Sequence, residues 1–281
     1  MNVHALLHEA QTALAKSVSA SEAKLEAQLL LQHAIGANRA WLIAHENDAL
    51  EANTHAAFEE LLQRRLNGEP IAYILGYREF YGLNLKVTAD TLIPRQDTET
   101  LVEAALTKTQ DSAPCSILDL GTGSGAIALA IAKYRLNAFV TAVDASQAAL
   151  DAAIENAKNL KISNVCFMLS DWFSALSNQK FDLIVSNPPY IEQSDAHLTQ
   201  GDLPWEPISA LVAGQDGLDD IRQIIQHAQQ HLKPHGWLIL EHGYNQAGKV
   251  ADLLKQAGFG EIKTLKDLGG NDRVTLGMML P

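Results

Sequence analysis

Apolar side chains recur at helical spacing along the N-terminal part of the chain. Residues 19–22 (Ser-Ala-Ser-Glu) have the capping-box pattern that starts helices, and an apolar stripe then runs from Leu25 to Ala34 before Gly36 can close it. A second stripe, from Thr54 to Leu66, stops before Gly68. We therefore expect a small all-helical domain over residues 1–72, serving to dock a substrate.

Between residues 73 and 93 the pattern changes to aromatic and β-branched residues interrupted by glycine. Tyr73, the run Phe80-Tyr81-Gly82 and the run Leu85-Lys86-Val87 are typical of two short strands joined by a tight turn. This segment predicts a β-hairpin that links the helical bundle to a larger domain, residues 94–281.

In that larger domain, short apolar runs alternate with helical segments. Strands separated by helices imply crossover connections and hence a parallel sheet. The last two runs are joined by so short a connection that they can only be antiparallel neighbours. The predicted fold class is α/β, a Rossmann-like and mostly parallel sheet with a C-terminal antiparallel hairpin. The expected strands are Ser116–Leu120, Ala138–Val143, Val165–Leu169, Phe181–Ser186, Gly236–Glu241, Glu261–Lys266 and Arg273–Met279.

The composition is that of a globular protein, and it disfavours nucleic acids and membranes as binding partners. Of the 281 residues, 47% are hydrophobic and 19% charged, which suffices for one large core and a smaller one. A formal net charge of −12 repels a polyphosphate backbone, so direct nucleic acid binding is not expected. The sequence has no signal-peptide pattern and no run of the ~18 apolar residues that crossing a bilayer requires, so we expect a cytoplasmic protein without a membrane partner. Cys115 and Cys166 have no second thiol nearby and are expected to pack.

A glycine-rich turn follows the first strand of the predicted sheet. The strand runs into Gly121-Thr122-Gly123-Ser124-Gly125, and a helical run begins at Ala126. Glycines at alternate positions let a ligand approach the main chain closely, beside a helix N-terminus. An ordinary tight turn explains the same pattern, so the neighbouring strands have to decide between the two interpretations.

The next two strands favour a cofactor site. The second strand ends in Asp144, whose carboxylate can accept hydrogen bonds from both hydroxyls of a ribose, or cap the following helix. The third leads to Asp171, which can bond an adenine amino group, and to Trp172, which can cover the adenine or pack in the core. The loop reads GxGxG, where dinucleotide-binding loops read GxGxxG. We therefore expect S-adenosylmethionine, with S-adenosylhomocysteine as product, and a methyltransferase sheet.

The fourth strand opens into Asn187-Pro188-Pro189-Tyr190. An amide nitrogen is a poor nucleophile because its lone pair is delocalised into the carbonyl. The Asn187 side-chain oxygen and a backbone carbonyl, held by two prolines, can each accept one N–H of a planar target and align it with a methyl group. Tyr190 can stack on that target. We predict that these four residues are catalytic and substrate-binding, although a rigid turn is the structural alternative.

Together these motifs resemble the bacterial release factor glutamine methyltransferases, the HemK or PrmC family. The resemblance covers nearly the whole chain and implies that Gly121 to Gly125, Asp144, Trp172 and Asn187 contact the cofactor. It also implies methyl transfer to the glutamine side-chain nitrogen in the Gly-Gly-Gln motif of class 1 peptide chain release factors. Gln96 departs from the family pattern, which has a second proline there. The segments that carry the resemblance are Phe80–Gly82, Leu92–Glu99, Asp119–Gly125, Asn187–Tyr190 and Asn271–Val274.

Other functions remain open from the residues alone. A glutamine methyltransferase acting on a ribosomal protein would use the same tetrapeptide and architecture. A DNA adenine N6-methyltransferase also uses an Asn-Pro-Pro-Tyr loop on a flipped base, but it should carry a basic face. A binding module that holds an adenosyl group without catalysis would not need a loop that polarises a nitrogen.

Two further sets of residues allow more than one interpretation. Arg95, Asp97 and Glu99 can steady the target loop or the cofactor, or form a salt-bridged helix start. His227, His231 and His235 recur every four residues, as metal ligands on a helix do. They have no evident carboxylate partner, and Pro234 should end the helix before the third histidine, so no metal is predicted.

Overall fold

The computed structural model describes residues 1–110 and 113–281, which fall into two compact units. Met1–Gly76 and Thr199–Trp205 form the first unit, and Tyr77–Leu198 and Glu206–Pro281 form the second. In the described ranges, no helix is both long enough and apolar enough to cross a bilayer.

The first unit is a helical bundle. Its second helix begins with the predicted capping box, in which Glu22 N donates to Ser19 Oγ (3.3 Å) and Ser19 N donates to Glu22 Oε2 (3.0 Å). The helix ends at Gly36, which has a left-handed φ of 72°, so both predicted ends are confirmed. The helices of this unit are α1 (Val3–Leu14), α2 (Ala20–Ile35), α3 (Arg39–Ala44), α4 (Ala52–Leu66) and α5 (Ile71–Leu75).

The second unit starts with the predicted hairpin. β1 (Tyr77–Phe80) pairs with β2 (Leu83–Lys86) in antiparallel register. The two turn residues, Tyr81 and Gly82, both have positive φ, as the tightest hairpin turns require. Tyr73 is not in the hairpin as predicted but in α5, because Pro70 and Gly76 delimit a short helix there.

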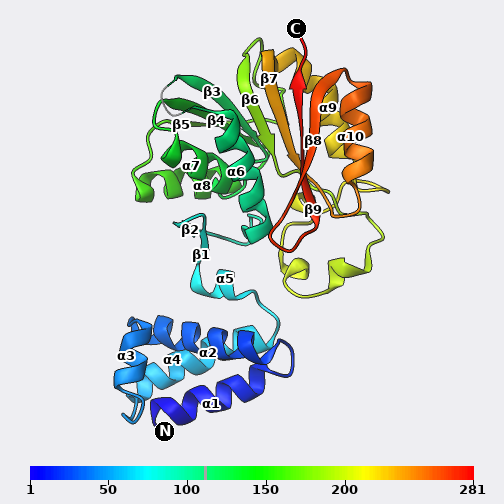
Figure 1. The fold of residues 1–281 in the computed structure, drawn as a ribbon. Coiled ribbons are helices and arrows are strands. Elements are labelled where there is room, and N and C mark those ends of the chain that lie inside the picture. Colours follow the sequence, from blue (N-terminus) through cyan, green and yellow to red (C-terminus); the bar gives the residue numbers. More distant parts are fainter. Residues whose placement is uncertain (111–112) are drawn as a thin grey trace. The chain divides into compact units, whose positions relative to one another are not determined.

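The central sheet has seven strands in the order β5-β4-β3-β6-β7-β9-β8 (Figure 1). All neighbours from β5 to β7 are parallel, whereas β9 is antiparallel to both β7 and β8. The predicted parallel sheet with a C-terminal antiparallel hairpin is therefore confirmed. The strands are β3 (Cys115–Leu120), β4 (Ala138–Asp144), β5 (Val165–Leu169), β6 (Phe181–Ser186), β7 (Leu232–Glu241), β8 (Phe259–Lys266) and β9 (Asp272–Met279).

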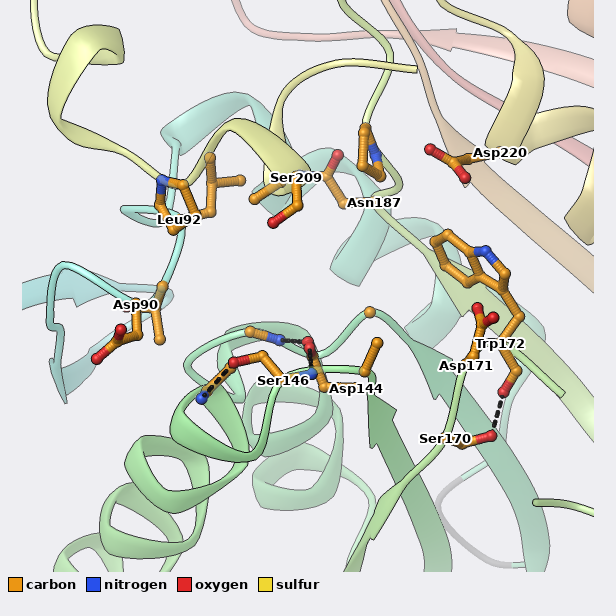
Figure 2. A pocket seen from close by; sticks show the side chains of 18 of the residues that line it. Asp90, Leu92, Asp144, Ser146, Ser170, Asp171, Trp172, Asn187, Ser209 and Asp220 are labelled. Carbon is orange, nitrogen blue, oxygen red and sulfur yellow. Dashed lines mark hydrogen bonds between the residues drawn. The ribbon is translucent and has the colours of Figure 1, made fainter. Parts of the chain in front are cut away.

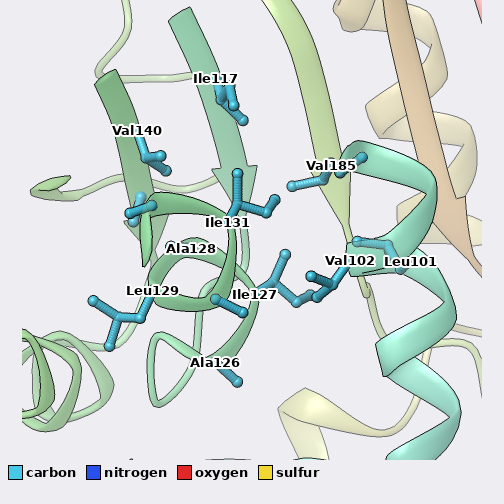
Figure 3. Close-up of a cluster of buried hydrophobic side chains, with 14 of the residues drawn as sticks. Leu101, Val102, Ile117, Ala126, Ile127, Ala128, Leu129, Ile131, Val140 and Val185 are labelled. Atoms are coloured by element: carbon cyan, nitrogen blue, oxygen red, sulfur yellow. The ribbon is translucent and has the colours of Figure 1, made fainter. Parts of the chain in front are cut away.

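Helices cover both faces of the sheet because successive residues of a buried parallel strand point to opposite faces. Ile117 packs in one hydrophobic cluster with α6 (Glu99–Lys108), α7 (Ala126–Tyr134) and α8 (Gln147–Leu160). The next residue, Leu118, packs in another cluster with α9 (Asp219–His231) and α10 (Ala247–Gln256). Figure 3 shows the apolar side chains of α7 lying between the strands and α6, as expected of a helix whose residues are apolar all round.

The strand order places a crevice at the centre of the sheet. The strands β3 and β6 are neighbours in the sheet. The chain continues from β3 to β4 on one side of this pair, and from β6 to β7 on the opposite side. Connections that leave neighbouring strands in opposite directions open a crevice at the carboxyl ends of those strands. Among the described residues, the short 3-10 helices are η1 (Gln96–Thr98), η2 (Ala196–Thr199), η3 (Leu203–Trp205) and η4 (Ile208–Ala210).

Candidate active site

A cavity of about 510 Å³ lies in this crevice (Figure 2). The residues that follow β3, β5 and β6 and the last residue of β4 line it, together with parts of the segments 89–92 and 207–210 and with Asp220. The structure thus brings together predicted residues from four strands. Those lining the cavity are Gly121, Gly123, Asp144, Asp171, Trp172, Asn187 and Pro189.

The glycine-rich loop forms an open cradle on one side of the cavity. Gly121 and Gly123 have left-handed φ values of 71° and 56°, which other residues rarely adopt. A Cβ at Gly121 would meet the Trp172 ring at 3.5 Å, whereas a Cβ at Gly123 would meet nothing within 4 Å. The main chain at Gly123 therefore borders open space that a ligand can fill.

Asp144 holds the cradle from the neighbouring strand. Its Oδ2 accepts a hydrogen bond from Gly123 N (2.8 Å), and its Oδ1 accepts one from Ser146 N (2.9 Å). The N-cap of α8 is Ser146, whose hydroxyl accepts from Ala149 N (3.2 Å), so Asp144 is not the helix cap. Each carboxylate oxygen of Asp144 keeps a lone pair for further donors such as ribose hydroxyls.

Trp172 covers the same part of the cavity. It has a positive φ of 46°, and its ring packs against Gly121. Asp220, a cavity residue of α9, lies near the indole (Figure 2). Burial, with the charges of Asp219 and Asp171, raises the pKa of Asp220. Asp220 is thus a cavity residue that the sequence did not predict.

The charged side chains lining the cavity are all carboxylates, those of Asp90, Asp144, Asp171 and Asp220. Lys and Arg are absent from the described residues that line it. Negatively charged carboxylates attract the positively charged sulfonium of an adenosyl cofactor and repel a negatively charged pyrophosphate. The residues present therefore fit S-adenosylmethionine better than a dinucleotide.

Asp119 supports the glycine-rich loop from below. Its Oδ2 accepts hydrogen bonds from Thr122 Oγ1 (2.7 Å) and Ala128 N (3.2 Å), while its buried Oδ1 has no partner among the described residues. Burial raises the pKa of this carboxyl group to about 7. Asp119 thus fixes the loop, and it keeps a free acceptor oxygen.

Asn187 lies on the cavity lining just beyond β6. Its Nδ2 donates a hydrogen bond to Thr98 Oγ1 (3.2 Å). The amide nitrogen is thereby engaged on the protein side, so the side-chain oxygen is left as the acceptor for a substrate. This is the arrangement that holding a planar NH2 group requires.

Tyr190, the last residue of the segment that begins with Asn187, is held by two hydrogen bonds. Its hydroxyl donates to Glu241 Oε1 (3.2 Å), and its main-chain oxygen accepts from Gln246 Nε2 (3.0 Å). Burial raises the pKa of the phenol well above its usual value. Tyr190 does not line the cavity, and its stacking on a substrate stays a prediction.

Other predicted residues lie behind the lining. Thr122 bonds Asp119, Ser124 is buried, and a Cβ at Gly125 would crowd α8 at Ala153. Pro188 lies between two lining residues without lining the cavity itself. Their cofactor and substrate contacts likewise stay predictions.

The segment from Arg95 to Glu99 pairs with three distant parts of the chain. Arg95 forms an ion pair with Glu206, which also accepts from Ile93 N (3.0 Å). Asp97 pairs with Arg273 (3.1 Å). Glu99 Oε1 accepts a hydrogen bond from Tyr81 N (3.0 Å). These residues therefore tie the segment to the β6–α9 connection, to β9 and to the hairpin, which goes beyond a local helix start.

The three spaced histidines lie in different surroundings. His231 stacks on Phe173 at a ring distance of 4.7 Å, and His227 Nδ1 lies 2.8 Å from the Gln223 carbonyl oxygen. His235 is outside the helix, in β7. The part of the chain that the structure describes contains no group of three side chains placed to hold a metal.

Known protein families match both parts of the chain. The family described as PrmC N-terminal domain matches residues 5–76, and the one described as methyltransferase domain matches residues 111–267. Three curated relatives bear the name release factor glutamine methyltransferase. That of Salmonella typhimurium is 48% identical and covers 98% of each chain, that of Pseudomonas aeruginosa is 51% identical (91% and 92%), and that of Escherichia coli is 44% identical (96% and 97%).

Solved structures show the same fold at low sequence identity. A methyltransferase from Pyrococcus furiosus is 17% identical with a TM-score of 0.54, covering 79% of this chain and all of that one. The 16S rRNA N2 G1207 methyltransferase of T. thermophilus, solved with AdoMet and guanosine, is 22% identical with a TM-score of 0.52, covering 72% of this chain and 49% of that one. Because the curated relatives share nearly half of their residues with this chain over almost its full length, the chain belongs to the release factor glutamine methyltransferase family.

Proposed function

We propose that this protein transfers a methyl group from S-adenosylmethionine to the side-chain amide nitrogen of the glutamine in the Gly-Gly-Gln motif of class 1 peptide chain release factors. The observation that carries the proposal is the placement of Asn187, whose NH2 group bonds Thr98 on the protein side while the residue lines the cavity. An amide oxygen so placed can accept an N–H of a second amide. The names of the full-length relatives support the release factor as substrate.

The cavity residues divide into a cofactor part and a target part. Asp144 receives the ribose, Trp172 covers the adenine, and the main chain at Gly123 allows close approach of the cofactor. S-adenosylmethionine, when bound, supplies an electrophilic methyl group and leaves as a thioether. The carboxylates of the lining favour its positive charge, and that charge is lost in the product.

The target part has to raise the reactivity of an amide nitrogen. Asn187 Oδ1 and a backbone carbonyl of the proline pair each accept one N–H of the glutamine, which fixes the plane of the amide and favours positive charge on nitrogen. With the cofactor bound, this nitrogen would take up its methyl group, and the cofactor sulfur would keep the electron pair of the carbon–sulfur bond. One N–H proton then passes to water, because the alkylated nitrogen is strongly acidic until it loses that proton.

Two related activities compete with this proposal. Methylation of a ribosomal-protein glutamine would use the same loop, and the names and full-length coverage of the relatives favour the release factor. Adenine methylation in DNA is disfavoured by the net charge of −12 and by a lining without Lys or Arg among its described residues.

The direct test uses the full-length protein with S-adenosylmethionine carrying a labelled methyl group and a cell lysate. Mass spectrometry then identifies the labelled protein and residue. We expect the label on the glutamine of Gly-Gly-Gln in a release factor. Label on a ribosomal protein, on DNA, or on another residue type would overturn the proposed substrate.

The role of Asn187 is tested by Asn187→Ala. We expect turnover to fall by ~10² or more with cofactor affinity largely intact, because one preorganised polar contact to the target is lost. The measurement is kcat with saturating release factor, alongside calorimetry of cofactor binding. Asn159→Ala, an exposed asparagine of α8, is the control. Unchanged turnover in Asn187→Ala would reject the assigned role.

A further inference from the structure

We propose that Asn156 and Glu206 are positioning residues for the cofactor, because they fix the two ends of one wall of the cavity. This wall is formed by residues 87–93, the wall segment, of which residues 89–92 line the cavity. The proposal deepens the proposed function and rests on it for the identity of the cofactor. Asn156 and Glu206 lie behind the lining, and both are buried, with exposed fractions of 1% and 6%.

The wall segment has a rigid turn at its centre. Thr91 N donates a hydrogen bond to the Thr88 main-chain oxygen (3.0 Å), and Thr88 N donates to Thr91 Oγ1 (3.2 Å). Figure 2 shows Asp90 and Leu92 on the side of the cavity away from Trp172. The shape of the turn is therefore set locally, whereas its distance from the rest of the cavity depends on what holds its two ends.

Asn156, a residue of α8, holds the first end. Its Oδ1 accepts a hydrogen bond from Lys86 N (2.7 Å), and its Nδ2 donates to the main-chain oxygens of Lys86 (2.9 Å) and Ser124 (2.9 Å). Lys86 ends β2 and directly precedes the wall segment, and Ser124 belongs to the glycine-rich loop. An asparagine side chain offers one amide oxygen and two N–H groups, and all three are used in these bonds. One side chain thus joins the wall segment to the glycine-rich loop.

Glu206 holds the second end. Its Oε2 accepts a hydrogen bond from Ile93 N (3.0 Å), the last residue of the wall segment, and its Oε1 forms the ion pair with Arg95. The residues that directly follow Glu206 return to the cavity, where Pro207, Ser209 and Ala210 line it. Glu206 therefore joins the wall segment to residues 207–210, a second part of the lining.

These bonds connect three parts of the lining that lie far apart in the sequence. The glycine-rich loop follows β3 and is placed by the central sheet, whereas β1 and β2 form a separate two-stranded sheet. The wall segment, which follows β2, accordingly depends on side chains for its place opposite the loop. When either Asn156 or Glu206 is lost, a cofactor in the cavity keeps the loop but loses a fixed wall. We therefore expect weaker cofactor binding, with the Asn187 segment unaffected.

Asn156→Ala is the principal test. We expect the Kd for S-adenosylmethionine, measured by calorimetry, to rise about tenfold, because three main-chain groups lose a buried partner. The KM for S-adenosylmethionine should rise with it, while kcat at saturating cofactor stays within about twofold of wild type. A general folding defect would instead lower kcat without a selective rise in this KM.

Asn164→Ala is the matched control for Asn156→Ala. Asn164 Nδ2 also donates to several main-chain oxygens, among them those of Ala132 (3.1 Å) and Ala138 (3.0 Å). Ala138 is the first residue of β4, so this asparagine acts at the edge of the sheet opposite the cavity. We expect both variants to unfold at lower urea concentration than wild type, and only Asn156→Ala to lose cofactor affinity.

Glu206→Gln tests the other end and does not depend on whether Asn156→Ala folds. Its single amide oxygen can face Ile93 N or Arg95 but not both, so we again expect an affinity about tenfold lower. Glu26→Gln is the control, because Glu26 is likewise buried and paired with an arginine, Arg65 (2.9 Å), in the helical unit. The double variant Asn156→Ala/Glu206→Gln should lose less than about a hundredfold, since both residues act on one segment.

Hydrogen–deuterium exchange gives a readout that needs no release factor. In wild type and Asn164→Ala, S-adenosylmethionine should slow exchange in peptides that cover the wall segment, and in Asn156→Ala these peptides should exchange faster before cofactor is added. Wild-type affinity in either folded variant would overturn the proposal, as would equal affinity losses in Asn156→Ala and Asn164→Ala. If the release factor is not methylated while affinity and exchange respond as expected, the proposed substrate fails and the positioning role stands.

Discussion

Asp144 joins two parts of the site through a single side chain. Its two oxygens accept N–H groups from Gly123 in the glycine-rich loop and from Ser146 at the start of α8. A carboxylate held in this way is already ordered without a ligand, so the proposed binding of a ribose would not have to order it.

Replacing Asp144 should therefore weaken the proposed cofactor site in two ways, by removing the proposed ribose contacts and by loosening the glycine-rich loop. We expect Asp144→Ala to reduce S-adenosylmethionine affinity at least about tenfold, measured by calorimetry. Asp151→Ala, on the exposed side of α8, is the control and should bind as wild type does. Equal affinity in Asp144→Ala would exclude the ribose contact.

Single residues differed in how well the sequence predicted them. Asp144 and Trp172 could be placed because the ends of successive parallel strands meet at one edge of a sheet. Glu241 also ends an apolar strand, and the same rule would have found it. Thr98 gave no such signal, because its partner Asn187 lies far away in the sequence and only the fold brings the two together.

The connection between β6 and α9 begins with Asn187–Tyr190, and its other end packs tightly against this segment. Gly217 has a φ of 68°, and a Cβ there would lie 2.2 Å from the Tyr190 main-chain oxygen and 2.8 Å from Gln246 Nε2. Gln246 Nε2 donates to both the Tyr190 oxygen (3.0 Å) and the Gly217 oxygen (3.3 Å). The backbone of the Asn187–Tyr190 segment is thus fixed by Gly217, near the start of α9, and by Gln246, which follows β7.

We expect Gly217→Ala to displace this backbone and to lower kcat about tenfold or more, since misplaced acceptors align the target poorly. Gly270→Ala is a matched control, because Gly270 also has a positive φ (84°) but open space around its Cβ position. Both variants should lose stability from backbone strain, and only the first should lose turnover. Equal turnover in the two variants would contradict the packing argument.

Elements were predicted well where apolar runs are long and regular, as in β3, β4 and β6. β7 begins at Leu232, earlier than the predicted Gly236, because its pairing with β6 shifts between Phe181 and Leu183 and so admits Pro234 and the positive φ of His235. Pro234, which we expected to end the preceding helix, therefore lies inside an irregular strand. Local propensity carries no information about such a shift, which depends on the partner strand.

At the scale of the whole molecule, the site imposes a cost on stability that depends on pH. Asp119 is fully buried beneath the glycine-rich loop, and burial raises its pKa from 3.8 to about 7, with the nearby charge of Asp144 acting in the same direction. The folded state then holds a proton that the unfolded state releases. Stability from this group is fully present below the unfolded pKa of 3.8 and is lost as the pH rises through about 7.

Asp119→Asn removes this titration while keeping an oxygen for Thr122 and Ala128. We expect the difference in free energy of unfolding between the variant and wild type to shift in favour of the variant, by on the order of 1 kcal/mol, between about pH 5 and about pH 8. Urea denaturation at the two pH values measures it. Some slope should remain in the variant, because burial also raises the pKa of Glu241 to about 7.

Asp182 supplies the control for the sign of this effect. Lys233 and Ser116 bond its carboxylate, and its pKa is lowered despite partial burial. Its contribution is present above the unfolded pKa of 3.8 and is lost only as the pH falls through the lower folded value. Asp182→Asn should therefore change stability by the same amount at about pH 5 and about pH 8. A constant difference for Asp119→Asn as well would show that its carboxyl group does not titrate in this range, and that the carboxylate beneath the glycine-rich loop is stabilised in its charged form.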